Sequence, residues 1–179
     1  MNSSAETVEN LDEALQDISE KLLDLQQSVT QQQQTNKNQA VFNSFLKARL
    51  PFDFSTIYKG KIYFISKTVA DFEIAYAASS CELYGGYLVE IDDEEELKFV
   101  SDFVSQTGKD VRYLTGLNDK TMEGYFEFYH SKKPMPSFLS LWNKCEPNSM
   151  VRVEVCTEIV GKLNDVTCGL PGKYVCQSQ

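Results

Sequence analysis

The chain has 179 residues, enough for one compact domain with an appendage but too few for two domains of ordinary size. Its net charge of −9 argues against a nucleic-acid or heparin surface, which needs clustered Lys and Arg, and suits a protein that gathers carboxylates around a hard cation. Hydrophobic residues make up 42% of the chain, so a core can be buried, and we expect no nucleic-acid partner.

The first thirty residues carry a heptad repeat. Apolar residues step by three and four without a break: Val8, Leu11, Leu15, Ile18, Leu22, Leu25 and Val29. The strict 3.5-residue period favours a parallel coiled coil over an amphipathic helix packed on its own domain. We therefore expect residues 1–50 to form a homo-oligomerisation segment and neck, with the number of strands left open. Residues 31–39 either continue the helix or form a linker, and Pro51 ends any helix there.

Residues 51–179 have the pattern of an α+β domain, with two helices early and a loop-rich antiparallel half after them. A strand is expected at residues 62–65. Helical spacing then runs over residues 69–84 and stops at Gly85-Gly86, a natural helix end. The residues that carry this spacing are Phe72, Ala75, Tyr76, Ser79 and Leu83.

A second helix is expected to begin at an acidic run, with Asp92 at the N-cap and Glu95 at N3. The run over residues 92–96 also has the composition of a calcium site. However, acids in a first helical turn interact favourably with the helix dipole, and the run lacks the glycine that an EF-hand loop needs. We therefore interpret it as a helix start.

The last third combines a long irregular loop with short strands. Residues 130–150 contain three prolines and little periodicity, and such a loop in a small domain is usually functional or disordered. Strands are expected at residues 151–155, 158–163 and 173–176.

The cysteines indicate an oxidising compartment. There are five, none in a CxxC pair: Cys81, Cys145, Cys156, Cys168 and Cys176. Their wide, uneven spacing favours a disulfide framework over zinc or thiol redox chemistry, and the odd count leaves one thiol over. We expect a secreted, extracellular protein whose numbered chain is a mature or engineered form, because residues 1–30 do not resemble a signal peptide. No stretch approaches the roughly 18 apolar residues of a membrane span.

Oxygen-bearing side chains concentrate near the C-terminus: Glu146, Asn148, Glu154, Asn164 and Asp165. Calcium takes six to eight oxygen ligands, so this set suits calcium and fits zinc poorly. A cis bond between Glu146 and Pro147 would let the side chains of Glu146 and Asn148 turn towards one point. Taken alone, Glu-Pro-Asn is a common tripeptide, and Asn164-Asp165 is also typical of a turn.

Several segments resemble motifs of the C-type lectin-like family. In chain order they are residues 85–89 (GGxL), 115–119 (the WIGL-type core strand), 123–126 (EGxW), 142–148 (W-x3-EPN), 154–156 (E-x-C), 163–168 (WND-x-x-C) and 174–176 (the closing strand). Phe126 and Leu163 stand where the family has Trp. The resemblance covers roughly residues 55–177 and implies the C-type lectin-like fold in residues 51–179, preceded by the coiled-coil helix.

The resemblance also implies the disulfides and a calcium site. Cys81 would pair with Cys176 and Cys156 with Cys168, which leaves Cys145 unpaired or available for an intermolecular bond. The metal ligands would be the five residues named above, Glu146, Asn148, Glu154, Asn164 and Asp165.

A secondary calcium site of relatives would use Asp119 and Glu123 together with Glu154. Two further acidic positions of that site are Ser149 and Val155 in this chain, which argues against a second ion.

By the same resemblance, the five ligands would also bind sugar, because vicinal sugar hydroxyls complete the calcium shell and bond to the same carboxylates and amides. The order Glu then Asn is associated with mannose, fucose and N-acetylglucosamine. Galactose is the less favoured alternative and would need a stacking aromatic residue. The expected function is a multivalent, calcium-dependent lectin for glycans.

We expect no enzyme. His130 is the one histidine, and the sequence contains no HExxH, no GxSxG and no Gly-rich phosphate loop. A Cys145–His130 pair would still need an orienting group and an oxyanion hole. The alternative function is a protein-, mineral- or ice-binding interaction module, because one fold supports many functions. Trp142 is expected in the core.

Overall fold

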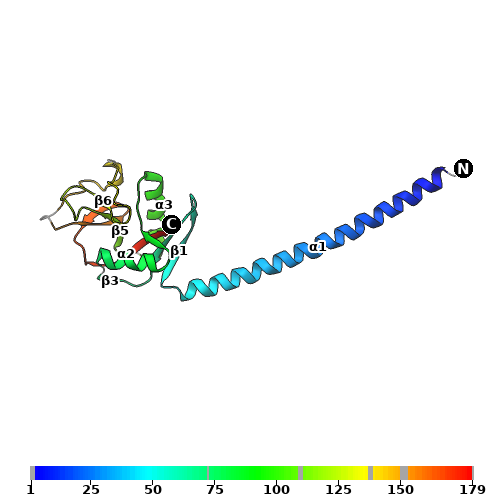
Figure 1. Cartoon of the computed structure of the whole chain (residues 1–179), viewed down its shortest axis with the longest axis horizontal. Coiled ribbons are helices and arrows are strands. Elements are labelled where there is room, and N and C mark those ends of the chain that lie inside the picture. The colour runs from blue at the N-terminus through cyan, green and yellow to red at the C-terminus, as the bar shows by residue number, and fades with distance from the viewer. Residues whose placement is uncertain (1–2, 72, 109–110, 137–138, 150–152, 179) are drawn as a thin grey trace. The chain divides into compact units, whose positions relative to one another are not determined.

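The structure is a computed structural model of the whole chain (Figure 1). It describes residues 3–71, 73–108, 111–136, 139–149 and 153–178. The chain divides into two units, Met1–Arg49 and Leu50–Gln179. Among the described helices, none is both long enough and apolar enough to cross a membrane.

The first unit is one helix, α1 (Ser3–Arg49), so the polar residues 31–39 continue the helix and it ends just before Pro51. Side-chain amides four residues apart bond to each other in this stretch, with Gln32 donating to Asn36 at 3.2 Å. The apolar heptad residues from Leu11 to Val29 are each more than half exposed, while the side chain of Val8 lies outside the described part. An exposed apolar seam on an uninterrupted helix is consistent with a coiled coil.

The second unit is α+β, as expected, and its centre is a twisted sheet with the order β1-β2-β9-β5-β7-β8. Neighbouring strands in this order are antiparallel except β5 and β9, which are parallel. Short strands β3 and β4 pair with β9, and β6 pairs with β5. The strands are β1 (Phe52–Tyr58), β2 (Lys61–Ser66), β3 (Ala70–Asp71), β4 (Gly86–Leu88), β5 (Tyr113–Asn118), β6 (Glu127–Phe128), β7 (Cys156–Val160), β8 (Lys162–Val166) and β9 (Pro171–Ser178).

Two helices, α2 (Ile74–Leu83) and α3 (Glu94–Thr107), complete the unit together with the short 3-10 helix η1 (Leu139–Leu141). Residues of α3 pack with β5, β7 and β8 in one apolar cluster, which contains Trp142 at 6% exposure. The expectation that Trp142 belongs to the core is therefore confirmed. A second cluster joins α2 to β2, β4 and β9.

Helix α2 is shorter than expected and buries a different face. Its buried residues are Ile74, Ala77, Ala78 and Cys81. In contrast, Tyr76 is 61% exposed and Leu83 is 79% exposed, and Phe72 lies outside the described residues. The expected face is wrong because small side chains let a helix approach a sheet closely, whereas hydrophobic size favours Tyr76 and Leu83.

Helix α3 begins one residue later than expected. Asp93, not Asp92, is the N-cap, and its carboxylate accepts a hydrogen bond from the backbone N–H of Glu96 at 2.6 Å. The prediction that the acidic run starts a helix is confirmed, with the cap displaced by one residue.

A hairpin of β7 and β8 replaces the single strand expected at residues 158–163. Gly161 lies between the strands with φ +75°, a conformation that glycine adopts without strain. The hairpin pairs Glu158 with Asn164 and Thr157 with Asp165. The strand expected at residues 151–155 is wrong for residues 153–155, which are not in a strand, and residues 151–152 lie outside the described part.

Two disulfides connect these elements. Cys81 of α2 is bonded to Cys176 of β9 with their Cα atoms 5.6 Å apart, and Cys156 of β7 is bonded to Cys168 with 5.3 Å between Cα atoms. These are the two pairs that the family resemblance implies. Cys145 is free and exposed.

Candidate functional site

The site is built where the loop after η1 meets the β7–β8 hairpin. The backbone N–H of Asn143 donates to the Leu163 carbonyl at 2.9 Å, and its side-chain amide donates to the carbonyls of Val160 and Lys162. Asn143 thus fastens the start of the loop to the turn of the hairpin. The expected ligands come from these two segments.

Three of the expected ligands lie together. The Glu146–Pro147 peptide bond is cis, and the Asn148 side-chain amide donates to both carboxylate oxygens of Glu146, at 2.9 and 2.7 Å. The backbone N–H groups of Asn148 and Ser149 donate to the two carboxylate oxygens of Asp165, at 3.1 and 2.6 Å. We call Glu146, Asn148 and Asp165 the EPN cluster. Burial raises the pKa of Glu146, and its contact with Asp165 raises that pKa further.

Asn164 belongs to a second group of residues. Successive residues of a strand point to opposite faces, so Asn164 leaves β8 on the face opposite to Asp165. Its side-chain amide donates to the buried carboxylate of Glu158 at 3.1 Å and to the backbone carbonyl of Asp165 at 3.0 Å. The same Glu158 oxygen accepts from the Arg112 guanidinium at 3.1 Å.

Glu154 lies close enough to Glu158 to act on it electrostatically. Burial is the main cause of the raised pKa of Glu158, with Glu154 adding to it and Arg112 opposing it. The five expected ligands are therefore found in two adjoining groups, the EPN cluster and the pair Glu154 and Asn164 near Glu158.

The residues of the expected secondary site lie beside the same loop. Asp119 is buried, and its Oδ2 accepts from the backbone N–H of Gly124 at 2.7 Å. Its Oδ1 is buried with no hydrogen-bond partner among the described residues. Burial raises the pKa of Asp119, and the nearby Glu123 raises it further. The Glu123 carboxylate in turn hydrogen-bonds to the hydroxyl of Ser149.

The donor chemistry of the site fits a calcium ion. Carboxylate and amide oxygens are the ligands that calcium prefers. Burial and neighbouring carboxylates raise the pKa of Glu146 and the pKa of Asp119, and a divalent cation stabilises carboxylates that lie so close together. Glu146, Asn148 and Asp165 of the EPN cluster would hold such an ion, and the remaining expected ligands, Glu154 and Asn164, lie in the adjoining group near Glu158.

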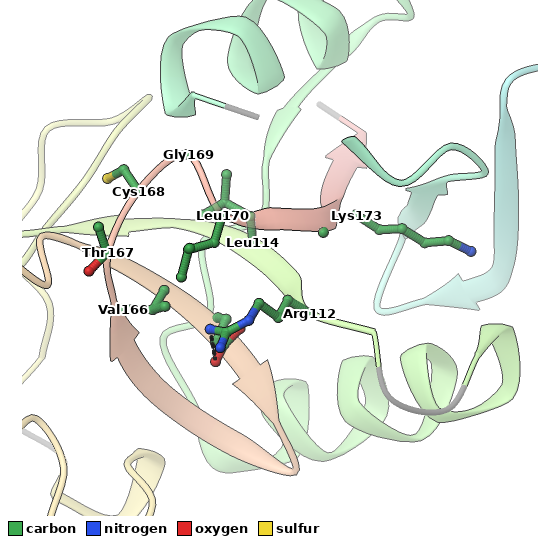
Figure 2. A pocket seen from close by; sticks show the side chains of 10 residues that line it. Arg112, Leu114, Val166, Thr167, Cys168, Gly169, Leu170 and Lys173 are labelled. Atoms are coloured by element: carbon green, nitrogen blue, oxygen red, sulfur yellow. Dashed lines mark hydrogen bonds and ion pairs between the residues drawn. The ribbon is translucent and has the colours of Figure 1, made fainter. Parts of the chain in front are cut away.

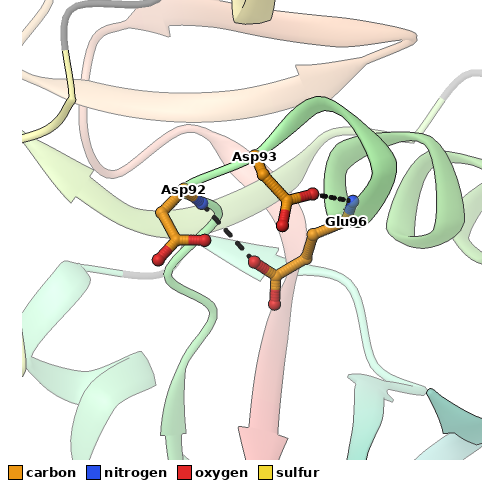
Figure 3. Close-up of side chains that lie close together, drawn as sticks. All are labelled: Asp92, Asp93 and Glu96. Carbon is orange, nitrogen blue, oxygen red and sulfur yellow. Dashed lines mark hydrogen bonds between the residues drawn. The ribbon is translucent and has the colours of Figure 1, made fainter. Parts of the chain in front are cut away.

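A further acidic cluster at the start of α3, formed by Asp92, Asp93 and Glu96, has another explanation (Figure 3). Asp93 caps the helix, and the buried Glu96 carboxylate accepts from the Lys61 ammonium at 2.7 Å and from the Tyr63 hydroxyl. A cap and a buried ion pair account for these acids, in agreement with the interpretation from the sequence.

A small pocket lies beside the Arg112–Glu158 ion pair (Figure 2). It is lined by the end of β8 and the turn into β9, with Leu114 from β5. Its volume of about 20 Å³ has room for roughly one water molecule. A pocket of this size does not admit a ligand larger than water.

His130 is exposed and stacks on the ring of Tyr87, with ring centroids 4.2 Å apart and an interplanar angle of 14°. This ring contact accounts for its orientation without a catalytic role.

Comparison with known proteins identifies the family. The model of the family described as "Lectin C-type domain" matches residues 72–178, more than half of the chain. The chain belongs to the C-type lectin domain family. Among curated relatives of this lectin domain, the CD209 antigens of Pongo pygmaeus and Homo sapiens are each 32% identical over 124 residues. The match covers 68% of this chain and 29% of each relative, so the chain spans less than a third of their length.

Solved structures show the same fold as this lectin domain. The mouse scavenger receptor C-type lectin carbohydrate-recognition domain has a TM-score of 0.60 at 20% identity, covering 70% of this chain and 95% of that one. The cow CD23 carbohydrate-recognition domain, solved in the presence of a GlcNAc2Man3 oligosaccharide, has a TM-score of 0.56 at 28% identity, covering 69% and 91%.

C-type lectin domains are carbohydrate-binding modules rather than enzymes, and the family is generally calcium-dependent. Membership in the family confirms the expectation of a non-enzymatic module.

Glu158 and Arg112 contact the surroundings of the expected ligand Asn164, and the sequence analysis does not single them out. Gly161 could have indicated them, because glycine is a common turn residue. A turn centred at Gly161 pairs residues 158 and 164 across a hairpin. A single strand over residues 158–163 hides that pairing.

Proposed function

We propose that this C-type lectin domain binds glycans in a calcium-dependent manner through Glu146, Asn148, Glu154, Asn164 and Asp165. The preferred ligands are glycans that end in mannose, fucose or N-acetylglucosamine. The protein acts outside the cell, which its two disulfides support.

The observation that carries the proposal is the EPN cluster. Its contacts to Asp165 span sixteen and seventeen positions of the chain, because the backbone N–H groups of Asn148 and Ser149 both donate to Asp165. The Asn148 side chain donates to Glu146. Asn148 is exposed and Glu146 is half-buried, so a sugar hydroxyl can reach them. Asp165 is buried below them at 1% exposure and holds the loop in place.

The side chains of Glu146 and Asn148 each recognise a different hydroxyl group of the sugar. Glu146 offers oxygens that accept from one hydroxyl, and the Asn148 amide nitrogen donates to the next. When bound, calcium supplies the positive charge that draws two adjacent hydroxyl oxygens to this edge. A sugar whose hydroxyls meet acceptor and donor in the wrong arrangement leaves a polar group unmatched, which costs roughly 1–3 kcal/mol.

The choice of sugar rests on the order Glu then Asn and on one relative. The cow CD23 domain, 28% identical, was solved in the presence of an oligosaccharide that contains mannose and N-acetylglucosamine. Galactose remains the less favoured ligand.

We propose further that α1 makes the lectin a parallel homo-oligomer. The heptads that carry Leu15 and Ile18 at a and d continue through the helix with amides: Gln32 and Gln39 at d, Asn36 and Asn43 at a. A fully overlapping antiparallel partner would set the apolar first half of the seam against this amide half and leave amides facing leucines. Parallel helices match apolar with apolar and amide with amide. A lone monosaccharide site typically has millimolar affinity, so clustering several sites supplies useful avidity.

Thermal unfolding tests the calcium site. At calcium about 100-fold above its dissociation constant, binding to the folded state adds about 2.7 kcal/mol, which corresponds to roughly 10 °C for a domain of this size. Glu146→Gln should lose most of this rise, whereas Glu82→Gln, the same change at an exposed position on α2, should keep it. A parent protein that melts at the same temperature in millimolar calcium and in chelator contradicts the assignment.

A further inference from the structure

We propose that Arg112 and Glu158 are positioning residues that hold the Asn164 amide with its nitrogen turned away from the metal and its oxygen available as a ligand. The inference rests on the proposed calcium site and deepens it, because it adds two residues outside the set of ligands.

The hairpin places Glu158 and Asn164 together. They are directly paired across β7 and β8, so both side chains lie on one face of the hairpin. The Asn164 nitrogen donates to Glu158 Oε1 at 3.1 Å and to the Asp165 carbonyl at 3.0 Å. Both partners are acceptors, and an amide carries its two donors on nitrogen alone. The amide orientation follows from this network, and its oxygen is left for a cation.

Glu158 is itself buried and hydrogen-bonded at one carboxylate oxygen. Its side chain is 5% exposed, and its Oε1 accepts from Arg112 at 3.1 Å as well as from Asn164. The backbone carbonyl of Arg112 accepts from the N–H of Lys173 on β9 at 2.8 Å, so the guanidinium is carried by a chain segment tied to the central sheet. The contacts from Arg112 to Glu158 and from Glu158 to Asn164 thus hold one proposed ligand in place relative to the central sheet.

Without this support the Asn164 side chain would lose its fixed orientation. An asparagine amide can rotate to present nitrogen in place of oxygen. Reorienting it costs free energy, which lowers the affinity for the metal. Groups that orient a metal ligand typically contribute 10–100-fold to metal affinity.

The test compares calcium affinity with stability in chelator for the full chain. Glu158→Met keeps the side-chain volume roughly constant and removes the acceptor, and we expect its calcium affinity to fall 10–100-fold. Glu158→Gln retains one acceptor oxygen and should recover part of that loss. Arg112→Met should give an intermediate loss, and Glu82→Met, an exposed control on α2, should give none. If the variants at Glu158 lower the melting temperature in chelator but bind calcium like the parent, the role is structural and the proposal is overturned.

A second measurement separates this proposal from the proposed function. In chelator, the Asn164 side-chain amide resonances, assigned with Asn164→Asp, should be shifted and protected from exchange in the parent and should lose both properties in Glu158→Met. Unchanged resonances overturn the positioning role whether or not calcium binds. A parent that binds no calcium overturns the proposed function, and the inference fails with it.

Discussion

Two neighbouring residues, Gly85 and Gly86, are glycine for different physical reasons. A Cβ on Gly86 would collide with the backbone carbonyl of Gln177 and lie 2.7 Å from Phe64 Cζ, because β4 presses against β9 at this point. A Cβ on Gly85 would meet open space, but Gly85 has φ +79°. The first glycine is required by close approach and the second by backbone conformation.

We therefore expect Gly86→Ala to destabilise the domain by about 3 kcal/mol, since overpacking against backbone is hard to relieve. Gly85→Ala should cost about 1 kcal/mol, the cost of a left-handed conformation for alanine. Chemical denaturation of both variants measures the two free energies. Equal losses would contradict the close approach of β4 to β9.

The sequence is more informative about the candidate ligands than about Glu158, which contacts one of them. Glu146, Asn148 and Asp165 stand out in the sequence as candidate ligands because oxygen-bearing side chains and motif spacing are visible there. Glu158 carries no such mark, since a single glutamate on an expected strand has many ordinary roles. Its proposed role arises from the turn at Gly161 and from Arg112, forty-six residues away.

Among the elements, α3 shows how a side chain determines where a helix begins, because the Asp93 carboxylate caps its first turn. The hydrogen bond from the Glu96 backbone N–H lowers the pKa of the Asp93 carboxyl, and Lys59 lowers it further. A carboxyl with a lowered pKa in the folded state stabilises the fold above its unfolded pKa and loses that contribution as the pH falls through the folded value.

Asp93→Ala should accordingly cost about 1 kcal/mol at pH 7, and the difference from the parent should shrink below about pH 4. Asp93→Asn is the matched control, because asparagine caps a helix equally well and does not titrate. Its stability relative to the parent should change little at pH 7. Urea unfolding at pH 7 and pH 3 measures these differences, and a constant gap for Asp93→Ala at both pH values would argue against the cap.

Elements with strong periodicity were predicted well, and those defined by small residues were not. The acidic start of α3 and the strand within β2 are visible in the sequence, as is the helical heptad segment. The buried face of α2 was not, because Ala77 and Ala78 carry little hydrophobic signal although they determine how closely α2 approaches the sheet. The hairpin at Gly161 is not predicted because the apolar residues Ile159, Val160 and Leu163 on either side of the glycine favour a single strand over residues 158–163.

At the scale of the whole molecule, the proposed avidity depends on oligomerisation through α1. Leu15→Pro should abolish the oligomer, because proline in a helix interior removes a backbone hydrogen bond and costs about 3 kcal/mol in each chain. Light scattering should show monomers for this variant and a larger species for the parent. Glu20→Ala, a surface change in the same helix outside the a and d seam, should leave the oligomer intact. An oligomer that survives Leu15→Pro places the interface elsewhere.

A glycan array run with the full chain tests whether this C-type lectin domain binds sugar by means of calcium. In millimolar calcium we expect binding to glycans that end in mannose, fucose or N-acetylglucosamine, weaker binding to those that end in galactose, and loss of all binding in chelator. Binding that is equally strong in chelator would contradict the claim, as would a chain that binds calcium and no glycan.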